Sequence, residues 1–346
     1  MSGRDAEGRL LASRIRRWIR GSLRGSPPEP FGPLALDIHH YQAAHDPVVR
    51  ALRENAPRSW MDIPAVPVDL YKDLSIGTVP EGRGRVFRTS GTTQGRRGIH
   101  RMWDTSLYDA GALPWAERCL GRWPETVHAL LIDPRRHPDS SLSHMIALMA
   151  RGPVHWYVGE HGLRVDDLNE ALAREKEAVF LPATAFALAE WIEGDFCAPP
   201  RASLIMITGG FKGRRHRIEG DALYERVRAL CPGVRLVTEY GMTELSSQLW
   251  GEPGTAFRPP PWLKVWAVDP FSGAGCPPEV AGQLRFLDLC NLDASIAVET
   301  LDEGIVHADG TLTLFGRLPG ASARGCSLTI EERWDDETRA GGEASR

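Results

Sequence analysis

A short polar loop at residues 89–98 carries residue types suited to binding an anion. Its sequence, TSGTTQGRRG, combines glycines that let the backbone approach a ligand with amides that can point inward as an anion-binding nest. The hydroxyl groups of Ser90, Thr92 and Thr93 add donors, and the two arginines that follow can neutralise phosphate charge. The loop has neither the lysine nor the spacing of a P-loop. A phosphate-binding loop and a purely structural turn are therefore the two alternatives.

Two further polar clusters directly follow apolar runs of strand length. TGG at residues 208–210 follows the run 204–207, and YGMTE at residues 240–244 follows the run 234–238. Ligands of open α/β sheets bind outside the carboxyl ends of the strands. We therefore expect both clusters, together with the loop at 89–98, at that edge of a sheet.

The elements that position these clusters alternate between strand and helix, which predicts an α/β fold with a mostly parallel sheet. Expected strands cover residues 127–132, 154–158, 179–181, 204–207 and 234–238. Expected helices begin at a cap formed by Ser140 or Ser141, at a cap formed by Asp166 or Asp167, at Ala183, and ahead of Leu223.

The pattern of the sequence changes after residue 259. Short strands at 265–268, 282–287, 305–306 and 312–315, separated by Gly, Pro and Asp-Gly turns, predict a small β-rich C-terminal subdomain. The expected organisation is a basic helix and linker at 1–30, one large domain at 31–330, and a disordered polar tail at 331–346.

Composition indicates a soluble globular protein. The 346 residues are 42% apolar with a formal net charge of -4, which gives no overall attraction to nucleic acid or membranes. Residues 1–25 hold seven arginines on an amphipathic helical pattern, for which packing on the chain's own domain is favoured over membrane or nucleic-acid contact. No apolar run reaches about 18 residues, so no membrane span is expected. Six scattered cysteines without a C-x-x-C pair indicate reduced thiols in a cytoplasmic protein, and no zinc-binding spacing occurs.

Taken in order, five motifs resemble those of the adenylate-forming enzymes: TSGTTQG at 89–95, TGGFK at 208–212, YGMTE at 240–244, TLDEG at 300–304 and FGR at 315–317. The closest likeness within that superfamily is to acyl-protein synthetase, the LuxE-type component that activates fatty acids in bacterial bioluminescence. It extends to VPV at 66–68 with Lys72, SSL at 140–142, ELSSQ at 244–248 and RGCSL at 324–328. The likeness covers about residues 60–330 and implies the α/β large domain of these enzymes, with an adenylation domain at 31–330.

The resemblance implies a nucleotide site built from all of these motifs. Gly209 and Gly210 would line the adenine, Tyr240 would stack on it, and Gly241 and Thr243 would belong to the same ATP-binding segment. The phosphate loop would hold the β- and γ-phosphates of ATP through its backbone, with Thr89, Ser90, Gly91, Thr92, Thr93 and Gly95 as its residues.

Three charged residues complete this implied site. Glu244 would hold Mg²⁺ through oxygen, as that hard ion requires. Asp302 would accept hydrogen bonds from the ribose hydroxyls, and Arg317 would contact the ribose or a phosphate. Three residues of the implied site have ordinary alternatives: Tyr240 as a core aromatic, Glu244 as a residue at a helix N-terminus, and Asp302 as a turn former.

Charge dictates the reaction that such a site performs. A carboxylate and the α-phosphate of ATP are both anionic, so attack needs Mg²⁺ and oriented donors, and it yields acyl-AMP and pyrophosphate. A thiolate can then take the acyl group as a thioester. Cys326 is the candidate, because Arg324 and Gly325 favour an accessible thiolate of lowered pKa. In the resembled family the cysteine of this segment is the acylated one, whereas a lone cysteine is ordinarily a structural residue.

Three functions follow as alternatives. The favoured one is activation of a carboxylic acid, expected to be a fatty acid, and transfer through Cys326 to a partner acyl reductase. The second delivers acyl-AMP to CoA or to a carrier-protein thiol. It is disfavoured because the lid domain of the larger enzymes, with its catalytic lysine, does not follow Arg317. The third is a non-catalytic nucleotide-binding scaffold. Two departures from the family pattern are Arg96-Arg97 in the loop and TLD in place of T-G-D.

Overall fold

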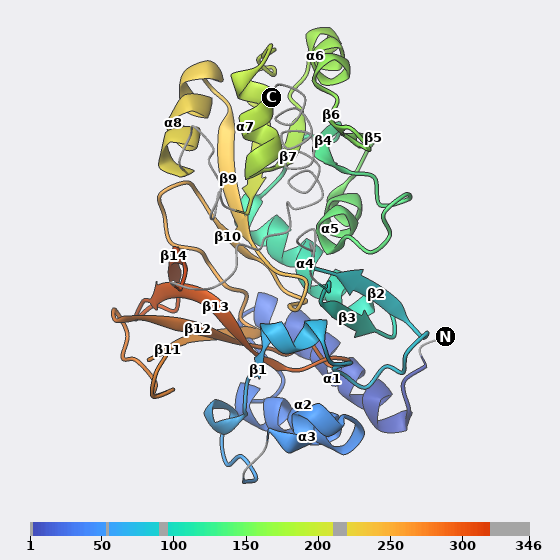
Figure 1. The fold of residues 1–346 in the computed structure, drawn as a ribbon, viewed down its shortest axis with the longest axis vertical. Coiled ribbons are helices and arrows are strands. Elements are labelled where there is room, and N and C mark those ends of the chain that lie inside the picture. Colours follow the sequence, from blue (N-terminus) through green and yellow to red (C-terminus); the bar gives the residue numbers. More distant parts are fainter. Residues whose placement is uncertain (1–2, 53–54, 90–95, 210–219, 319–346) are drawn as a thin grey trace, which may run out of the picture.

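The computed structural model describes residues 3–52, 55–89, 96–209 and 220–318, and its centre is a seven-stranded sheet with the strand order β10-β9-β8-β7-β4-β5-β6 (Figure 1). Five strands are parallel, and the two edge strands β10 and β6 are antiparallel. The strands are β4 (Val127–Ile132), β5 (Val154–Gly159), β6 (Gly162–Leu163), β7 (Phe180–Thr184), β8 (Leu204–Thr208), β9 (Arg235–Tyr240) and β10 (Leu249–Gly251). The predicted parallel α/β sheet is confirmed.

Helices cover both faces of this sheet because successive strand residues alternate between two cores. Met206 and Val237 belong to the core under α4 (Ser106–Leu120) and α5 (Ser141–Met149). Their neighbours Ile205 and Leu236 belong to the core under α6 (Val165–Arg174), α7 (Ala185–Glu193) and α8 (Gly220–Leu230). The side of the sheet that each residue faces therefore follows from its position along the strand.

A second sheet lies beside the carboxyl edge of the first (Figure 1). It contains β1 (Val66–Pro67), β11 (Leu263–Val268), β12 (Ala281–Asp288), β13 (Ala297–Val306) and β14 (Leu312–Arg317). The predicted β-rich C-terminal part is therefore present, but β13 is much longer than the expected strand at 305–306. It includes Asp302, which lies within the strand opposite Arg317 of β14. Asp302 as a turn former is therefore wrong.

Helix starts differ from the sequence prediction at two places. The third predicted helix begins at Ala185 because Thr184 caps it, its hydroxyl accepting from the Ala187 amide at 3.2 Å. Asp166 and Asp167 are not the cap of α6; they lie in its first turn after Arg164. Carboxylates there stabilise the helix through its dipole rather than by capping. Ser140 caps α5 as predicted, accepting from the Ser143 amide.

The N-terminal segments pack below the two sheets. They are α1 (Ala6–Leu23), α2 (Phe31–His45), α3 (Pro47–Ala51) and the short 3₁₀ turns η1 (Trp60–Asp62) and η2 (Val68–Lys72). Leu11, Ile15 and Trp18 of α1 lie in the same core as α4. Arginines of this region pair within the chain: Arg14 contacts Glu29 and Asp37, at 2.6 and 2.7 Å.

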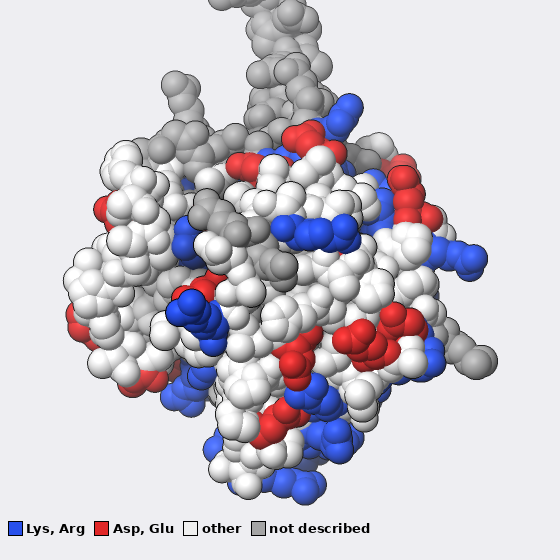
Figure 2. Space-filling model, turned by 90° about the horizontal axis from the view of Figure 1, so that it is seen from below, with Lys and Arg blue, Asp and Glu red and all other residues white. Residues whose placement is uncertain are grey.

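Figure 2 shows acidic side chains beside basic ones on the face seen from below. Among the described residues, no helix combines the length and hydrophobicity that a bilayer span requires. The polar segment 331–346, predicted as a tail, lies outside the described residues.

A buried ion pair fixes the start of the chain to the C-terminal half. Arg4, 2% exposed, donates from Nε and Nη2 to the two carboxylate oxygens of Asp293, at 2.7 and 2.5 Å. The amide of Trp103 also donates to Asp293, at 2.9 Å. Removing one partner of such a pair leaves an uncompensated buried charge.

We therefore expect Arg4→Met to lower the free energy of unfolding by about 3–5 kcal/mol, measured by urea denaturation. The matched control is Arg20→Met, because Arg20 is exposed on α1 and should change the unfolding free energy by less than about 0.5 kcal/mol. Equal unfolding curves for the two variants would show that the Arg4–Asp293 pair does not hold the N-terminal segment in place.

Candidate functional site

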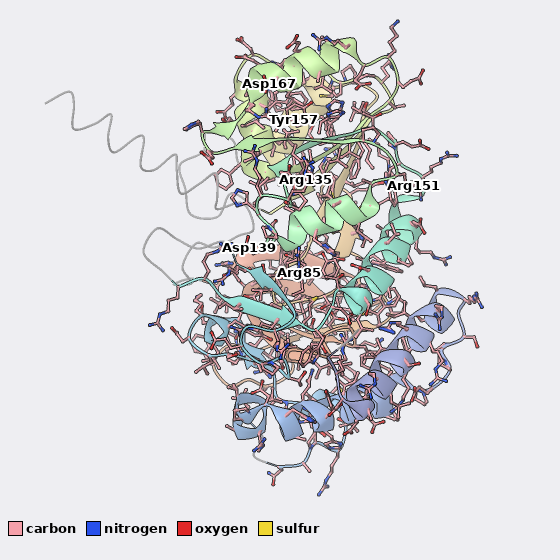
Figure 3. The ribbon with its side chains drawn as sticks, turned by 90° about the vertical axis from the view of Figure 1, so that its right-hand side faces the viewer. Arg85, Arg135, Asp139, Arg151, Tyr157 and Asp167 are labelled. Atoms are coloured by element: carbon pink, nitrogen blue, oxygen red, sulfur yellow. The ribbon has the colours of Figure 1, made fainter. Side chains whose placement is uncertain are left out.

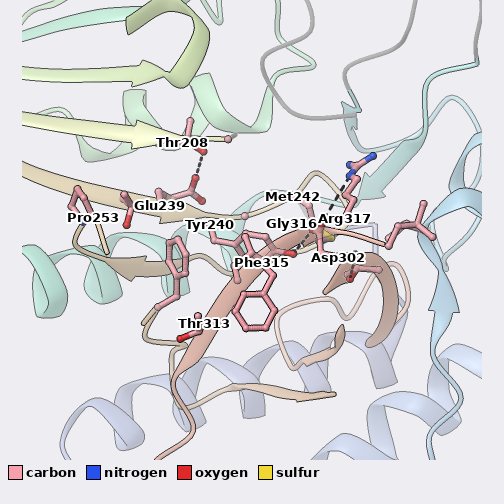
Figure 4. A pocket seen from close by; sticks show the side chains of 18 of the residues that line it. Thr208, Glu239, Tyr240, Met242, Pro253, Asp302, Thr313, Phe315, Gly316 and Arg317 are labelled. Carbon is pink, nitrogen blue, oxygen red and sulfur yellow. Dashed lines mark hydrogen bonds and ion pairs between the residues drawn. The ribbon is translucent and has the colours of Figure 1, made fainter. Parts of the chain in front are cut away.

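A pocket of about 840 Å³ lies where the carboxyl ends of β8 and β9 meet the C-terminal sheet (Figure 4). Residues of η2, the hairpin strand end at Thr89, the first turn of α8, and strands β13 and β14 complete its walls. The pocket brings together eight residues of the predicted site: Thr89, Gly209, Tyr240, Gly241, Thr243, Asp302 and Arg317, predicted to bind ATP, and Glu244, predicted to hold Mg²⁺. Seven other predicted residues lie outside the described part of the chain: Ser90, Gly91, Thr92, Thr93, Gly95, Gly210 and Cys326.

The base of the polar loop is a hairpin formed by β2 (Arg85–Arg88) and β3 (Ile99–Met102). Thr89 and Gly98 close it: the Thr89 amide donates to the Gly98 carbonyl at 2.9 Å, and the Gly98 amide donates to the Thr89 hydroxyl at 2.7 Å. The chain therefore enters and leaves the loop at adjacent points, and Thr89 lines the pocket.

Arg97 helps to fix this base instead of standing free for a phosphate. Its Nε donates to the Thr89 carbonyl at 2.6 Å and its Nη1 to Asp139 at 2.9 Å. Asp139 lies beside the hairpin in Figure 3, and its carbonyl accepts from the Arg88 amide at 2.9 Å. Arg96, with its side chain 79% exposed, lies 3.8 Å from Asp73.

A hydrogen bond joins the two sheets inside the pocket. The hydroxyl of Tyr240, at the end of β9, donates to Oδ2 of Asp302 in β13 at 2.8 Å. Arg317 of β14 approaches Oδ1 of the same carboxylate, with Nε at 3.5 Å. Burial and the Asp302 charge raise the pKa of Tyr240, so the phenol keeps its proton and acts as the donor. Its ring lies parallel to Phe286, at 5.8 Å between centroids.

Glu244 lies in a turn after β9, not at a helix N-terminus. The backbone carbonyl of Glu244 accepts from the side-chain amide of Asn291 at 2.8 Å. Asp288 holds the residues that follow: its carboxylate accepts from the Ser246 amide at 3.1 Å and from the Ser247 hydroxyl at 2.9 Å. Glu244 is 8% exposed, and burial raises the pKa of its carboxyl to about 7, against a lowering by Arg317.

The charges of the pocket fit a divalent cation carried with phosphate. Six acidic residues line it, against the two basic residues Lys72 and Arg317: Asp69, Asp221, Glu239, Glu244, Glu252 and Asp302. Lys72 is itself paired with Asp69. The described residues contain no group of three ligands that could hold a metal ion. Mg²⁺ in nucleotide sites is commonly held by one or two carboxylates together with substrate phosphates and water.

Among the pocket residues that were not predicted from the sequence, Glu239 is the buried carboxyl that pairs with Thr208. It is the last residue but one of β9, and its carboxylate accepts from the Thr208 hydroxyl of β8 at 2.5 Å. The available signal was an acidic residue directly before the YGMTE segment, at the end of a strand. Position 241 requires a glycine, because a Cβ there would lie 2.4 Å from Oε1 of Glu239. Gly209, with φ of 75°, has a backbone conformation that favours glycine.

Comparison with solved structures identifies the fold. The chain is similar to O-succinylbenzoate coenzyme A synthetase (MenE) from Bacillus subtilis in complex with ATP and magnesium ion, with a TM-score of 0.50, 19% identity, and coverage of 69% of this chain and 52% of that one. It is also similar to the same enzyme in complex with the acyl-adenylate intermediate OSB-AMP, with a TM-score of 0.50, 20% identity, and coverage of 67% and 48%. No protein-family profile and no curated protein sequence matches the chain.

These similarities show the fold: an α/β architecture like the large domain of adenylate-forming enzymes, as predicted. The chain spans about half the length of the enzymes it matches.

The raised carboxyl pKa of Glu244 has a consequence for stability. Between the ordinary value of 4.5 and about 7, the folded protein binds a proton that the unfolded chain has released. Stability from this group therefore falls as the pH rises through that interval. Glu244→Gln cannot ionise and should gain unfolding free energy relative to the original protein between about pH 5 and about pH 8, on the order of 3 kcal/mol.

Urea denaturation at both pH values measures this difference in the absence of nucleotide. Glu177→Gln is the control, since Glu177 is exposed outside the pocket and its replacement removes one carboxyl group without changing the site. A pH profile for Glu244→Gln parallel to that of the original protein would show that Glu244 is not buried in a desolvated site.

Proposed function

We propose that the protein uses ATP to activate a carboxylic acid as acyl-AMP, with the adenylation unit at residues 31–330. The supporting observation is the single pocket that unites the Tyr240–Glu244 segment with Asp302, Arg317 and the base of the polar loop. In the reaction a carboxylate oxygen attacks the α-phosphorus. A P–O bond forms, the bond to the bridging oxygen of the β-phosphate breaks, and pyrophosphate leaves with the electron pair.

The nucleotide is assigned to the side of the pocket that carries Tyr240. Asp302, held by Tyr240 and Arg317, presents a carboxylate that can accept from ribose hydroxyls. Arg317 supplies positive charge for the ribose or a phosphate. Because Tyr240 holds Asp302 through its hydroxyl, it positions the ribose acceptor in addition to offering its ring to the adenine.

Glu244 is the residue assigned to hold Mg²⁺, which when bound neutralises phosphate charge and so permits the attack of one anion on another. The buried carboxyl favours its neutral form without a nearby cation, as its raised pKa shows. A divalent cation removes that penalty, which couples metal binding to ionisation of Glu244. Thr89 and the loop that it begins are assigned to the terminal phosphates.

The second half-reaction is proposed as transfer of the acyl group to the thiolate of Cys326, with AMP as the leaving group, for delivery to a partner acyl reductase. Fatty acids are the substrates of the resembled acyl-protein synthetases. The alternative acceptors are CoA and a carrier-protein thiol. Cys119 and Cys231 are poor rivals within the chain, because burial raises the pKa of each thiol to about 11.

Carboxylate-dependent exchange of pyrophosphate into ATP tests the first half-reaction. We expect exchange with a screen of carboxylic acids and Mg²⁺, and we expect Glu244→Gln to lose at least about a hundredfold in rate, since an amide oxygen cannot supply the charge that the metal requires. Glu177→Gln, an exposed glutamate outside the pocket, should retain the original rate. Exchange at the normal rate in Glu244→Gln would remove that residue from the metal site, and nucleotide binding without any exchange would favour the scaffold alternative.

Covalent labelling tests the second half-reaction. With radiolabelled acid and ATP, the protein should carry a label that survives denaturation and is released by neutral hydroxylamine, as a thioester is. Cys326→Ser should abolish the label while leaving exchange intact, because the two half-reactions use different groups. Cys197→Ser is the control and should label normally. Undiminished label in Cys326→Ser would identify another nucleophile, and no label in the original protein would favour transfer to CoA or a carrier thiol.

A further inference from the structure

Thr208 and Glu239 form a polar pair at the end of the pocket away from Asp302 and Arg317 (Figure 4). They are register partners at the ends of the parallel strands β8 and β9. Side chains alternate along a strand, so these two residues face the same side as Met206 and Val237, toward α4 and α5. Tyr240, the next residue of β9, points to the opposite side of the sheet. The pocket therefore presents Glu239 on one face of β9 and the proposed nucleotide residues on the other.

The carboxyl group of Glu239 is poorly satisfied. Glu239 is 6% exposed, and Thr208 donates its hydroxyl to Oε2 at 2.5 Å. Within the described part of the chain, no other group donates to this carboxyl, and none is recorded at Oε1. A buried carboxylate ordinarily needs two or more donors, and without them burial favours its neutral form. Burial accordingly raises the pKa of Glu239 to about 7.

Gln248 lies near Glu239, beside Gly241. Oε1 of Glu239 and Cγ of Gln248 lie 2.4 and 3.6 Å from the position that a Cβ on Gly241 would occupy. The side-chain amide nitrogen of Gln248 donates a hydrogen bond to the hydroxyl of Tyr108 at 2.9 Å. Its Oε1 is buried and has no hydrogen-bond partner among the residues described. Of these two residues only Glu239 lines the pocket, so a molecule that fills this end meets the open Oε1 of Glu239.

We propose that Glu239 is a specificity-determining residue that selects acids bearing a hydrogen-bond donor, a hydroxyl or ammonium group, over the unsubstituted alkyl or aryl acid. This inference rests on the proposed activation of a carboxylic acid and refines its substrate class. The donor of the substrate completes the hydrogen bonding of Oε1, which Thr208 leaves open. An unsubstituted acid excludes water from the carboxyl group of Glu239 and supplies no hydrogen-bond donor in its place.

The donor-bearing acid should be preferred over the unsubstituted acid, because only the former leaves no polar group unpaired. A site built to bond a substrate hydroxyl rejects the analogue that lacks it, because the buried partner is left unsatisfied. Protonation of Glu239 softens this effect, since the neutral carboxyl tolerates burial better than the carboxylate does. We therefore expect a preference of at least about tenfold in kcat/KM, below the largest values known for such sites.

Matched acids in the pyrophosphate-exchange assay test the proposal. The pairs are octanoate with β-hydroxyoctanoate and β-aminooctanoate, and benzoate with its ortho-, meta- and para-hydroxy and amino derivatives. The original protein should favour at least one donor-bearing acid over its parent by about tenfold or more in kcat/KM. Glu239→Ala should bring that ratio to about one by losing activity toward the donor-bearing acid. Glu239→Gln keeps the shape of the side chain but removes its charge. It should therefore lower the ratio most for the amino-substituted acids.

The control variant is Glu177→Ala, because Glu177 is exposed and lies outside the pocket, so its replacement should leave every ratio unchanged. A preference for the unsubstituted acids, or ratios unchanged in both Glu239 variants, would overturn the proposal while the proposed reaction stands. A second arm replaces ATP by purine riboside triphosphate, which lacks the adenine amino group. If the Glu239 variants alter discrimination between these nucleotides instead of between the acids, Glu239 reads the base, and the proposal is wrong.

A failure of the proposed function is separable from a failure of this inference. If no acid supports exchange, the same acid pairs are titrated into the original protein and Glu239→Ala by calorimetry in the presence of ATP. Tighter binding of a donor-bearing acid that is lost in Glu239→Ala supports the inference without the reaction. Equal affinity within every pair, or no binding of any acid, overturns it.

Discussion

The hydrogen bond between Tyr240 and Asp302 is the contact on which the pocket depends. It connects the end of a parallel strand to the middle of an antiparallel one, and Arg317 approaches the same carboxylate from the neighbouring strand. The donor is a phenol whose pKa burial raises, so Tyr240 keeps the proton that it donates. The two sheets are thereby joined at the pocket by a short polar contact that burial protects from competition by water.

Burial of carboxyl groups is the main electrostatic constraint of this site. Glu239 and Glu244 both have a pKa raised to about 7, and desolvation is the larger cause for each. Native proteins keep such groups where a ligand repays the desolvation, and active sites are the usual place. The two groups lie on different parts of the pocket and call for different compensation: a cation for Glu244, among phosphates, and a hydrogen-bond donor for Glu239.

Much of the α/β framework was predictable because hydrophobic periodicity records burial directly. The strands at 127–132 and 204–207 and the cap at Ser140 agree with the structure to within a residue or two. The errors arose where tertiary contacts override local pattern. Asp302 looks like part of a turn in D-E-G, yet it pairs across strands with Arg317. Arg97 looks available to a phosphate, yet it is bonded to Asp139, which is distant in the sequence.

The sequence by itself determined the order and chemical type of the site motifs, since the loop, the YGMTE segment and Asp302 are recognisable from residue types and spacing. Only the tertiary structure decided how they act together. It showed that Tyr240 holds Asp302, and that Glu239 turns away from Tyr240 to meet Thr208 with one oxygen left open. The physical reason is that burial and hydrogen-bond satisfaction are properties of three-dimensional neighbours. A one-dimensional pattern gives the side of a strand on which a residue lies, but not the groups that it meets there.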